Sequence, residues 1–218
     1  MVLALDTALS ACSAAVCADG VVLAALSEPM DRGHQERLAP LVAETMAAAG
    51  IAFPAIDRLA VTVGPGSFTG LRVGIAFAKG LALALDRPCA GAGTLEALAA
   101  SAGPGFVAAV IDAHRGQLYL QAFCDGAPVM APDVLEQAEA AARLAELYPG
   151  GPAWVIGPGA HLLAGVLPAA RIDPRTAPDV AALALRTAAG PAPSSPPRPL
   201  YLRAPDARTI AERAAVQR

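Results

Sequence analysis

The composition of the 218-residue chain excludes an intrinsically disordered protein, because 55% of its residues are hydrophobic and only 16% are charged. Aromatic residues make up 4%, which argues against a β-sandwich and against a surface that stacks nucleic-acid bases. The net charge of −3 provides little attraction for a phosphate backbone. We therefore expect any RNA to be held mainly by a partner.

The sequence shows neither a membrane span nor a secretion signal. Its most apolar region, 71–85, contains Arg72 and Lys79, whereas a span needs about 20 apolar residues in a row. The N-terminal residues lack the basic start and the small-residue cleavage site of a signal peptide. We therefore expect a cytoplasmic protein that does not contact a membrane.

Strand-like and helix-like patterns alternate in the first half of the chain. They predict, in chain order, strands over 2–7, 12–17 and 21–26, a helix over 35–49, a strand over 59–63, a helix over 67–85, a strand near Cys89 and a helix over 94–102. Asp19-Gly20 is typical of a hairpin turn, so the first three strands should form an antiparallel meander. Pro40 fits the first predicted helix only within its first turn, where backbone N–H groups have no helical partner.

The second half repeats this order. The recurring features are Asp6 with Asp19-Gly20 and Asp112 with Asp125-Gly126, both at a spacing of 13 residues, and strands that run into Gly-Pro-Gly at 62–66 and 154–159. Their shared order indicates an α/β protein built from a duplicated βββαβα unit.

Glycine and proline mark the predicted domain boundaries. Gly103-Pro104-Gly105 separates a first lobe, 1–103, from a second lobe, 104–190. The proline-rich stretch 190–199 is typical of a stiff, extended connector. We expect the connector and the C-terminal tail, 191–218, to pack back on the lobes, with a helix in the tail.

Two turns of the first lobe are candidates for nucleotide binding. In duplicated lobes of this kind a ligand lies between the lobes, where the first hairpin turn and the glycine turn can face phosphates. The candidate cofactor-binding residues are Asp6, Thr7, Ser10, Gly64 and Gly66. The glycine turn matches neither G-x-G-x-x-G nor a P-loop, and a tight turn in which glycine allows close packing is the favoured alternative.

A metal site and a catalytic residue are not expected. Asp6 could position a metal-bound water or a phosphate, but it could equally accept hydrogen bonds from its own turn. His34 begins a predicted helix, yet Arg37 and Leu38 stand where a second histidine ligand would be needed. Buried free thiols are favoured for the cysteines, which lack C-x-x-C spacing: Cys12, Cys17, Cys89 and Cys124.

Small residues at intervals of four form a stripe along the predicted helix over 67–85. The stripe consists of Gly66, Gly70, Gly74, Ala78 and Ala82. It permits close approach of another element, either within the same domain or at a subunit interface. For the interface we predict residues of this helix and of the helix over 35–49, namely Leu38, Leu41, Met46, Gly70, Leu71, Gly74, Ile75, Ala78 and Leu81.

Several segments resemble the TsaB family of bacterial tRNA threonylcarbamoyladenosine biosynthesis proteins. The resemblance is carried by Arg32-Gly33-His34 with Glu36-Arg37-Leu38, by 63–74 (VGPGSFTGLRVG), by Ala78-Lys79-Gly80-Leu81, by Asp6-Thr7, by 94–99 (TLEALA), by Asp112-Ala113 and by Tyr201-Leu202-Arg203. It is densest over 1–100, and the glycine-phenylalanine segment is its most specific part.

The resemblance implies an actin-like (ASKHA, ribonuclease H-like) fold of two lobes. It also implies a non-catalytic partner subunit for threonylcarbamoyl transfer to the adenosine beside the anticodon of tRNAs that read codons beginning with A. The implied partners are a TsaD-like transferase subunit, which the chain would bind and activate, and a TsaE-like ATPase. The tRNA would be bound only through the complex, with a homodimer when the partner is absent. No cofactor is firmly implied, although ATP or ADP could bind in the complex.

One departure from the family pattern bears on this implication. Metal-binding relatives carry two histidines at the helix start, whereas this chain has His34 and Leu38 there. The alternative function is an autonomous ATP-dependent kinase or ATPase that uses Asp6 and the Gly-Pro-Gly turns.

Overall fold

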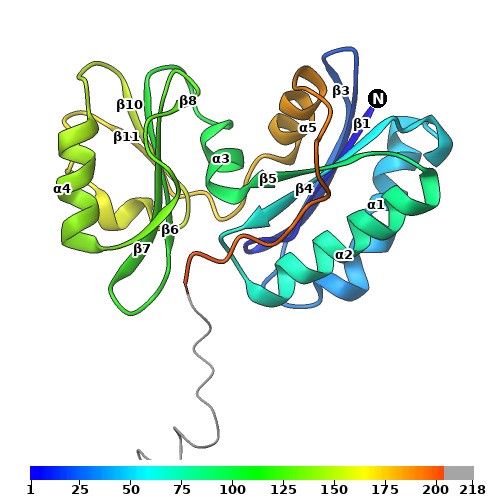
Figure 1. The fold of residues 1–218 in the computed structure, drawn as a ribbon, viewed down its shortest axis with the longest axis horizontal. Helices are drawn as coiled ribbons and strands as arrows, with labels where there is room; N and C mark the ends of the chain where they lie inside the picture. Colours follow the sequence, from blue (N-terminus) through cyan, green and yellow to red (C-terminus); the bar gives the residue numbers. More distant parts are fainter. Residues whose placement is uncertain (204–218) are drawn as a thin grey trace, which may run out of the picture.

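The computed structural model describes residues 1–203 and contains two β-sheets with helices between them and on their outer faces (Figure 1). The helix predicted in the tail lies outside the described residues. Each sheet begins with antiparallel strands and continues with parallel ones, so the predicted α/β class is confirmed.

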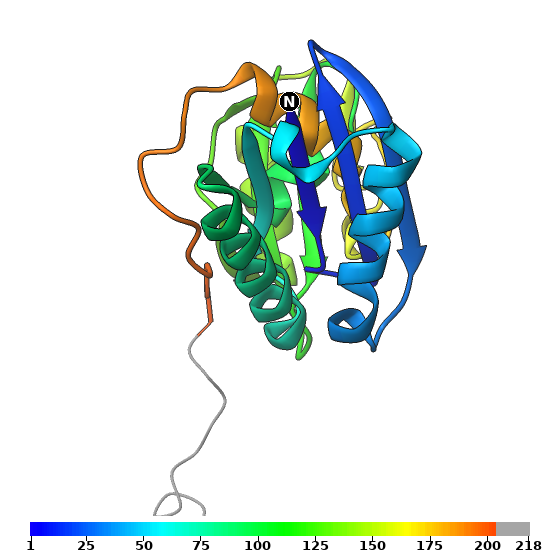
Figure 2. The ribbon, with the colours of Figure 1, turned by 90° about the vertical axis from the view of Figure 1, so that its right-hand side faces the viewer.

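The first sheet has the strand order β3-β2-β1-β4-β5. Its strands are β1 (Val2–Asp6), β2 (Ala11–Ala18), β3 (Val21–Pro29), β4 (Arg58–Gly64) and β5 (Cys89–Gly93). The helices α1 (His34–Ala49) and α2 (Phe68–Leu85) lie side by side on one face, and a 3-10 turn, η1 (Phe53–Ala55), precedes β4 (Figure 2). Leu3 and Leu5 of β1 face these helices, whereas Val2 and Ala4 face the other side.

The second sheet has the order β11-β10-β6-β7-β8, with β9 also paired to β7. Its strands are β6 (Phe106–Asp112), β7 (Gln117–Cys124), β8 (Ala127–Pro128), β9 (Asp133–Glu136), β10 (Ala153–Ile156) and β11 (Arg171–Asp173). The helix α4 (Gln137–Leu147) packs on its outer face through Ala140 and Leu144.

The same backbone turns occur in both halves, which confirms the duplication. Asp19 and Gly20 both have positive φ angles, 50° and 77°, and Asp125 and Gly126 repeat them at 46° and 81°. A positive φ at both central residues is the signature of a type I′ hairpin turn. Gly64, which ends β4, and Gly157, which follows β10, also have nearly the same φ angle, 116° and 114°.

Two local predictions differ from the structure. Pro40 lies inside α1 rather than in its first turn. Both Pro40 and Glu36 are exposed, so water can replace the missing N–H donor for the Glu36 carbonyl. In the second half, the helix equivalent to α2 is only a 3-10 turn, η2 (Ala160–Leu163), because Gly165 has φ 82° and Pro168 follows.

The two helices that end the halves exchange places. The helix α3 (Thr94–Ala99) packs Leu95 and Leu98 on the inner face of the second sheet, although it follows β5. The helix α5 (Val180–Ala189) follows β11, yet it packs Val180 and Leu183 on the first sheet. Both helices lie between the sheets (Figure 1). The lobe ranges 1–103 and 104–190 stay a prediction, but each range supplies a helix to the core of the other.

Among the described residues, α2 is the one helix long and apolar enough to cross a membrane, with a mean hydropathy of 1.5. Core helices of globular proteins meet the same criterion. Gly70, Gly74, Ala78 and Ala82 on one side of α2 are buried against the first sheet and its β1–β2 turn, so α2 is a core helix in this fold.

Candidate functional site

Asp6 ends β1 and is wholly buried. Its Oδ1 accepts a 2.6 Å hydrogen bond from Thr62 Oγ1 and a 3.2 Å bond from the backbone N–H of Ala8. Its Oδ2 has no hydrogen-bond partner. Burial raises the pKa of Asp6 to about 6, although the Thr62 hydrogen bond opposes the rise. Asp6 thus accepts a hydrogen bond from its own turn, which was one of the two predicted alternatives, and a second from Thr62 of β4, which was not predicted.

The structure brings Thr7, Gly64 and Gly66 beside Asp6. Thr7 Oγ1 donates a 2.8 Å hydrogen bond to the carbonyl of Gly70. A Cβ atom on Gly66 would lie 2.3 Å from the Ala8 carbonyl oxygen, and one on Gly64 would lie 2.6 Å from the Leu200 carbonyl oxygen. Close packing of the chain on itself therefore accounts for both glycines.

Ser10, the fifth candidate, lies half-buried in the β1–β2 turn, and its N–H donates to the Thr176 carbonyl at 3.3 Å. Hydrogen bonds or close packing within this chain thus account for the surroundings of all five candidate residues. Nucleotide binding by them stays a prediction.

The second lobe contains an equivalent turn after Asp112. Asp112 Oδ1 accepts a 2.7 Å hydrogen bond from the N–H of His114, as Asp6 does from Ala8. A Cβ on Gly159 would lie 2.9 Å from the Asp112 nitrogen. The two halves therefore present related hairpin and glycine turns, as expected of a duplicated fold.

His34 begins α1 and is 8% exposed, with no hydrogen-bond partner at Nε2. One turn later Leu38 is packed in the core. Within residues 1–203, no three His, Cys, Asp or Glu side chains are grouped so that they could hold a metal ion. The nearby N-terminus of α2 is capped by the chain itself, because Ser67 Oγ accepts from the N–H of Gly70, whereas α1 has no side-chain cap.

The predicted partner residues lie almost entirely inside the first lobe, which corrects the prediction that they form a contact surface. A Cβ on Gly74 would lie 2.3 Å from Thr7 Oγ1, so the small-residue stripe admits the β1–β2 turn and not a partner helix. Only Leu81 of the nine is half-buried, and the eight buried residues are Leu38, Leu41, Met46, Gly70, Leu71, Gly74, Ile75 and Ala78.

The exposed faces of α1 and α2 were missed by the sequence reasoning. On α1, the exposed residues include Ala39, Ala43 and Ala47, a second stripe at intervals of four. On α2, Leu83 is 85% exposed. The available signal was a leucine outside the small-residue stripe of this helix. A helix of a globular protein usually buries one face only, so an apolar residue on the other face is expected to be exposed.

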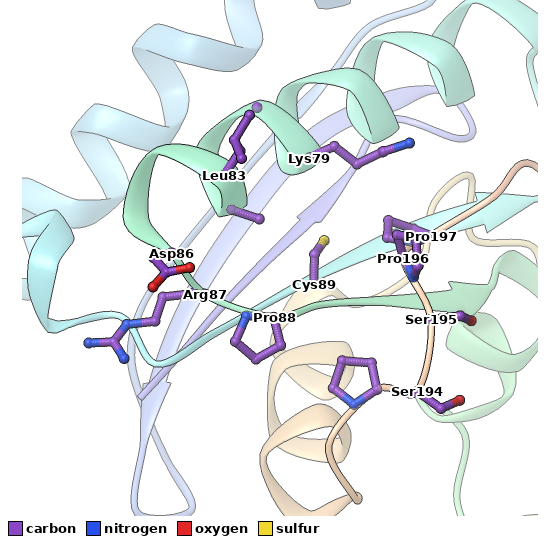
Figure 3. Close-up of a pocket in the computed structure, with 13 residues that line it drawn as sticks. Lys79, Leu83, Asp86, Arg87, Pro88, Cys89, Ser194, Ser195, Pro196 and Pro197 are labelled. Carbon is purple, nitrogen blue, oxygen red and sulfur yellow. The ribbon is translucent and has the colours of Figure 1, made fainter.

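A groove of about 780 Å³ lies between the C-terminal end of α2 and the proline-rich connector (Figure 3). Leu83 and Lys79 project beside it, Pro193–Pro197 form its other wall, and Cys89 lies at its floor. Burial raises the pKa of the Cys89 thiol to about 11, so this thiol is a poor nucleophile. The groove therefore combines apolar residues with the charged Lys79, Asp86 and Arg87, and its thiol is not activated for nucleophilic attack.

Comparisons with known proteins identify relatives of this architecture. A family model described as tRNA N6-adenosine threonylcarbamoyltransferase (TsaD) matches residues 26–189. The solved structure of YeaZ, the TsaB protein, from Pseudomonas aeruginosa has a TM-score of 0.78 and 31% identity, over 92% of this chain and 99% of that chain. The chain belongs to the TsaB family, within the TsaD domain family.

The similarity to this chain covers half of some relatives and nearly the whole length of others. The tRNA threonylcarbamoyladenosine biosynthesis protein TsaB of Escherichia coli (strain K12) is 43% identical over 122 residues, which are 54% of this chain and 52% of that protein. The matched part thus spans about half the length of that relative. An uncharacterized protein of Mycobacterium tuberculosis (strain ATCC 25618 / H37Rv) is 36% identical over 96% of this chain and 95% of its own length.

The fold extends beyond the TsaB family. The ethanolamine utilization protein EutJ from Carboxydothermus hydrogenoformans shares the architecture at a TM-score of 0.52 and 10% identity, over 84% of this chain and 87% of that chain. At this identity only the fold is comparable. The actin-like, ASKHA class expected from the sequence is confirmed.

Proposed function

We propose that this protein is a non-catalytic subunit of a threonylcarbamoyl transfer system. It would bind and activate a TsaD-like transferase that modifies the adenosine beside the anticodon of tRNAs reading codons that begin with A. The observation that carries this proposal is the 43% identity to Escherichia coli TsaB, whose name places that protein in threonylcarbamoyladenosine biosynthesis. The cytoplasm is the proposed location, because tRNA is modified there.

The chemistry of the first lobe supports an accessory role. A transferase needs groups that touch its substrate, whereas Asp6 is wholly buried and accepts its two hydrogen bonds from Thr62 Oγ1 and the N–H of Ala8. Leu38, where a second histidine would stand beside His34, is packed in the core. The charges support the same role: with a net charge of −3, the chain should bind tRNA weakly alone and reach it through the complex.

The partner surface is proposed on the outward faces of α1 and α2. Ala39, Ala43 and Ala47 would let a helix of the transferase approach α1 closely, because small side chains keep the two backbones near each other. The half-buried Leu81 would add apolar contact on α2. Without the transferase, a second copy of the chain could cover the same surface and form a homodimer.

ATP or ADP is proposed to bind only in the assembled complex. In the free chain, Leu200 packs against Gly64 and Ala8 packs against Gly66, the two glycines proposed to face phosphates. A TsaE-like ATPase is the proposed third member of the complex. The alternative of an autonomous kinase or ATPase predicts steady ATP turnover by the chain alone.

Reconstitution tests the proposal. TsaD-like and TsaE-like proteins, ATP, an activated threonylcarbamoyl donor and a tRNA that reads a codon beginning with A would be combined with and without this chain. Modified adenosine is measured by mass spectrometry of digested tRNA. We expect at least a tenfold stimulation by the chain and no ATP turnover by the chain alone. Equal modification without the chain would contradict the proposal, and ATP turnover by the chain alone would favour the kinase alternative.

A further inference from the structure

The segment after α5 runs across the molecule without forming a helix or strand. Its start is held by Arg58 of β4, whose Nη1 donates to the carbonyls of Thr187, Gly190 and Pro191 at 2.8, 2.9 and 3.0 Å. From there the segment passes in front of β5 and β4 toward the lower edge of both lobes (Figure 1, orange to red). The part over 197–203, which we name the strap, makes the contacts that follow.

The strap first packs on the first lobe. Pro197 is buried, and a Cβ on Gly91 of β5 would lie 3.2 Å from its Cβ. The N–H of Leu200 donates a 2.7 Å hydrogen bond to the carbonyl of Val63, at the end of β4. The carbonyl of Leu200 lies against Gly64, and there is room for it only because glycine has no side chain. The strap therefore continues the hydrogen bonding of β4 at the glycine turn.

Tyr201 fastens the strap to the N-terminal end of α2. Its ring lies 5.6 Å from the ring of Phe68, centroid to centroid. The guanidinium carbon of Arg72 lies 3.8 Å from the centroid of Phe68, and Arg72 Nε donates to the Tyr201 hydroxyl at 3.3 Å. Aromatic and cation–π contacts of this kind are individually weak but directional. They fix where the strap leaves the first lobe.

Arg203 fastens the strap to the second lobe. Its Nη1 donates a 2.9 Å hydrogen bond to the carbonyl of Ala113, and its Nη2 donates to the carbonyl of His114 at 3.4 Å and to the side chain of Gln117. These acceptors belong to the hairpin turn that follows Asp112. A guanidinium group suits this role, because its planar set of donors can satisfy several oxygens at once.

Only three peptide steps separate the contact of Leu200 with the first lobe from that of Arg203 with the second. Three extended residues span about 11 Å at most. While both contacts persist, the glycine turn after β4 and the hairpin turn after β6 cannot move apart beyond the reach of this short segment. We propose that the strap is a conformational lock that holds the two lobes in one relative orientation, and that the bonds of Arg203 are its releasable end.

Pulsed electron spin resonance on the full chain tests the lock. Spin labels are placed at Ala47 on α1 and Ala142 on α4, two exposed positions on opposite outer faces of the molecule, in a Cys124→Ser background. Arg203→Met removes the donors while retaining an apolar stem of similar length. Arg198→Met, at an exposed arginine in the same strap, is the matched control. Circular dichroism melts check that each variant is folded.

We expect a narrow distance distribution for the unsubstituted strap and for Arg198→Met, and a distribution at least twice as broad for Arg203→Met. Tyr201→Ala, which loosens the strap at the first lobe, should broaden it as well. An unchanged width in folded Arg203→Met would overturn the proposal, as would equal broadening by Arg198→Met. The measurement needs no transferase or tRNA, so its outcome is independent of the proposed function.

Discussion

The Oγ1 atom of Thr7 lies where a side chain on Gly74 would have to stand, 2.3 Å from the position of a Cβ atom there. We expect Gly74→Ala to lower the free energy of unfolding by about 1 to 3 kcal/mol, because the core must shift to admit the methyl group. A longer side chain such as arginine should prevent folding.

A second glycine of the same helix serves as the control for Gly74. A Cβ on Gly80 meets nothing within 4 Å, so Gly80→Ala should stabilise the protein by up to about 1 kcal/mol through helix propensity. Thr7→Ala should remove part of the cost of Gly74→Ala, since it deletes the obstructing oxygen. Urea denaturation of the single and double variants measures both effects. Equal stability of Gly74→Ala and Gly80→Ala would contradict the close contact.

The carboxyl group of Asp6 should make stability depend on pH. Burial raises its pKa from 3.8 to about 6, so the folded state holds this proton more firmly than the unfolded state does. The resulting stabilisation is complete below about pH 4 and is lost as the pH rises through about 6. The loss amounts to at most about 3 kcal/mol.

Asp6→Asn isolates this effect. The amide oxygen can still accept from Thr62 and Ala8, but the variant cannot ionise. In urea denaturation between pH 4 and 7.5, the wild type should lose stability relative to Asp6→Asn, and the variant should be the more stable protein above pH 6. Parallel curves for the two proteins would show that Asp6 is not held protonated by burial.

The outward face of α1 should control association with the transferase. Ala43→Arg places a long, charged side chain on the exposed small-residue stripe, so we expect at least tenfold weaker binding to a TsaD-like subunit at an unchanged melting temperature. Ala142→Arg, on the exposed side of α4 in the other lobe, is the matched control. Calorimetric titration measures both variants, and equal binding by Ala43→Arg and wild type would place the interface elsewhere.

The four cysteines should differ in reactivity. Burial raises the pKa of Cys12 and Cys89 to about 11 and also raises that of Cys17, whereas Cys124 is half-buried. At pH 8, a thiol of pKa 11 is ionised in about one molecule in a thousand, and only the thiolate reacts with alkylating reagents. Mass spectrometry of briefly alkylated native protein should find one adduct, on Cys124, and four adducts after unfolding. Rapid labelling of Cys89 would show that the groove floor is open to reagents.

Local sequence patterns were sufficient to predict most elements. The Asp-Gly pairs and the two Gly-Pro-Gly turns each require backbone angles that few residues adopt, so they mark the same turns in both halves. The helix expected over 67–85 is present as α2 (Phe68–Leu85), with Ser67 as its N-cap. These features depend on neighbours within a few residues, which the sequence displays directly.

The candidate site was harder to predict, because its contacts join distant parts of the chain. A small-residue stripe indicates that something approaches closely, but it does not indicate what; for Gly74 the answer is Thr7, 67 residues away. The role of Gly64 depends in the same way on Leu200. Nothing near either glycine in the sequence identifies its neighbour in the fold. The stripe was therefore predicted to contact a partner protein, whereas it contacts other residues of the first lobe.

The exchanged helices α3 and α5 bear on how this chain arose. A single ancestral half would have left the inner face of its sheet bare, because the helix that ends each half covers the other half. Such a half would be stable only as a pair of identical chains that traded this helix, a domain-swapped dimer. Joining two such copies end to end by gene duplication would give the order of elements seen in this chain. On this view, the two fragments produced by a cut within Gly103-Pro104-Gly105 should each be unstable alone and should regain structure when mixed.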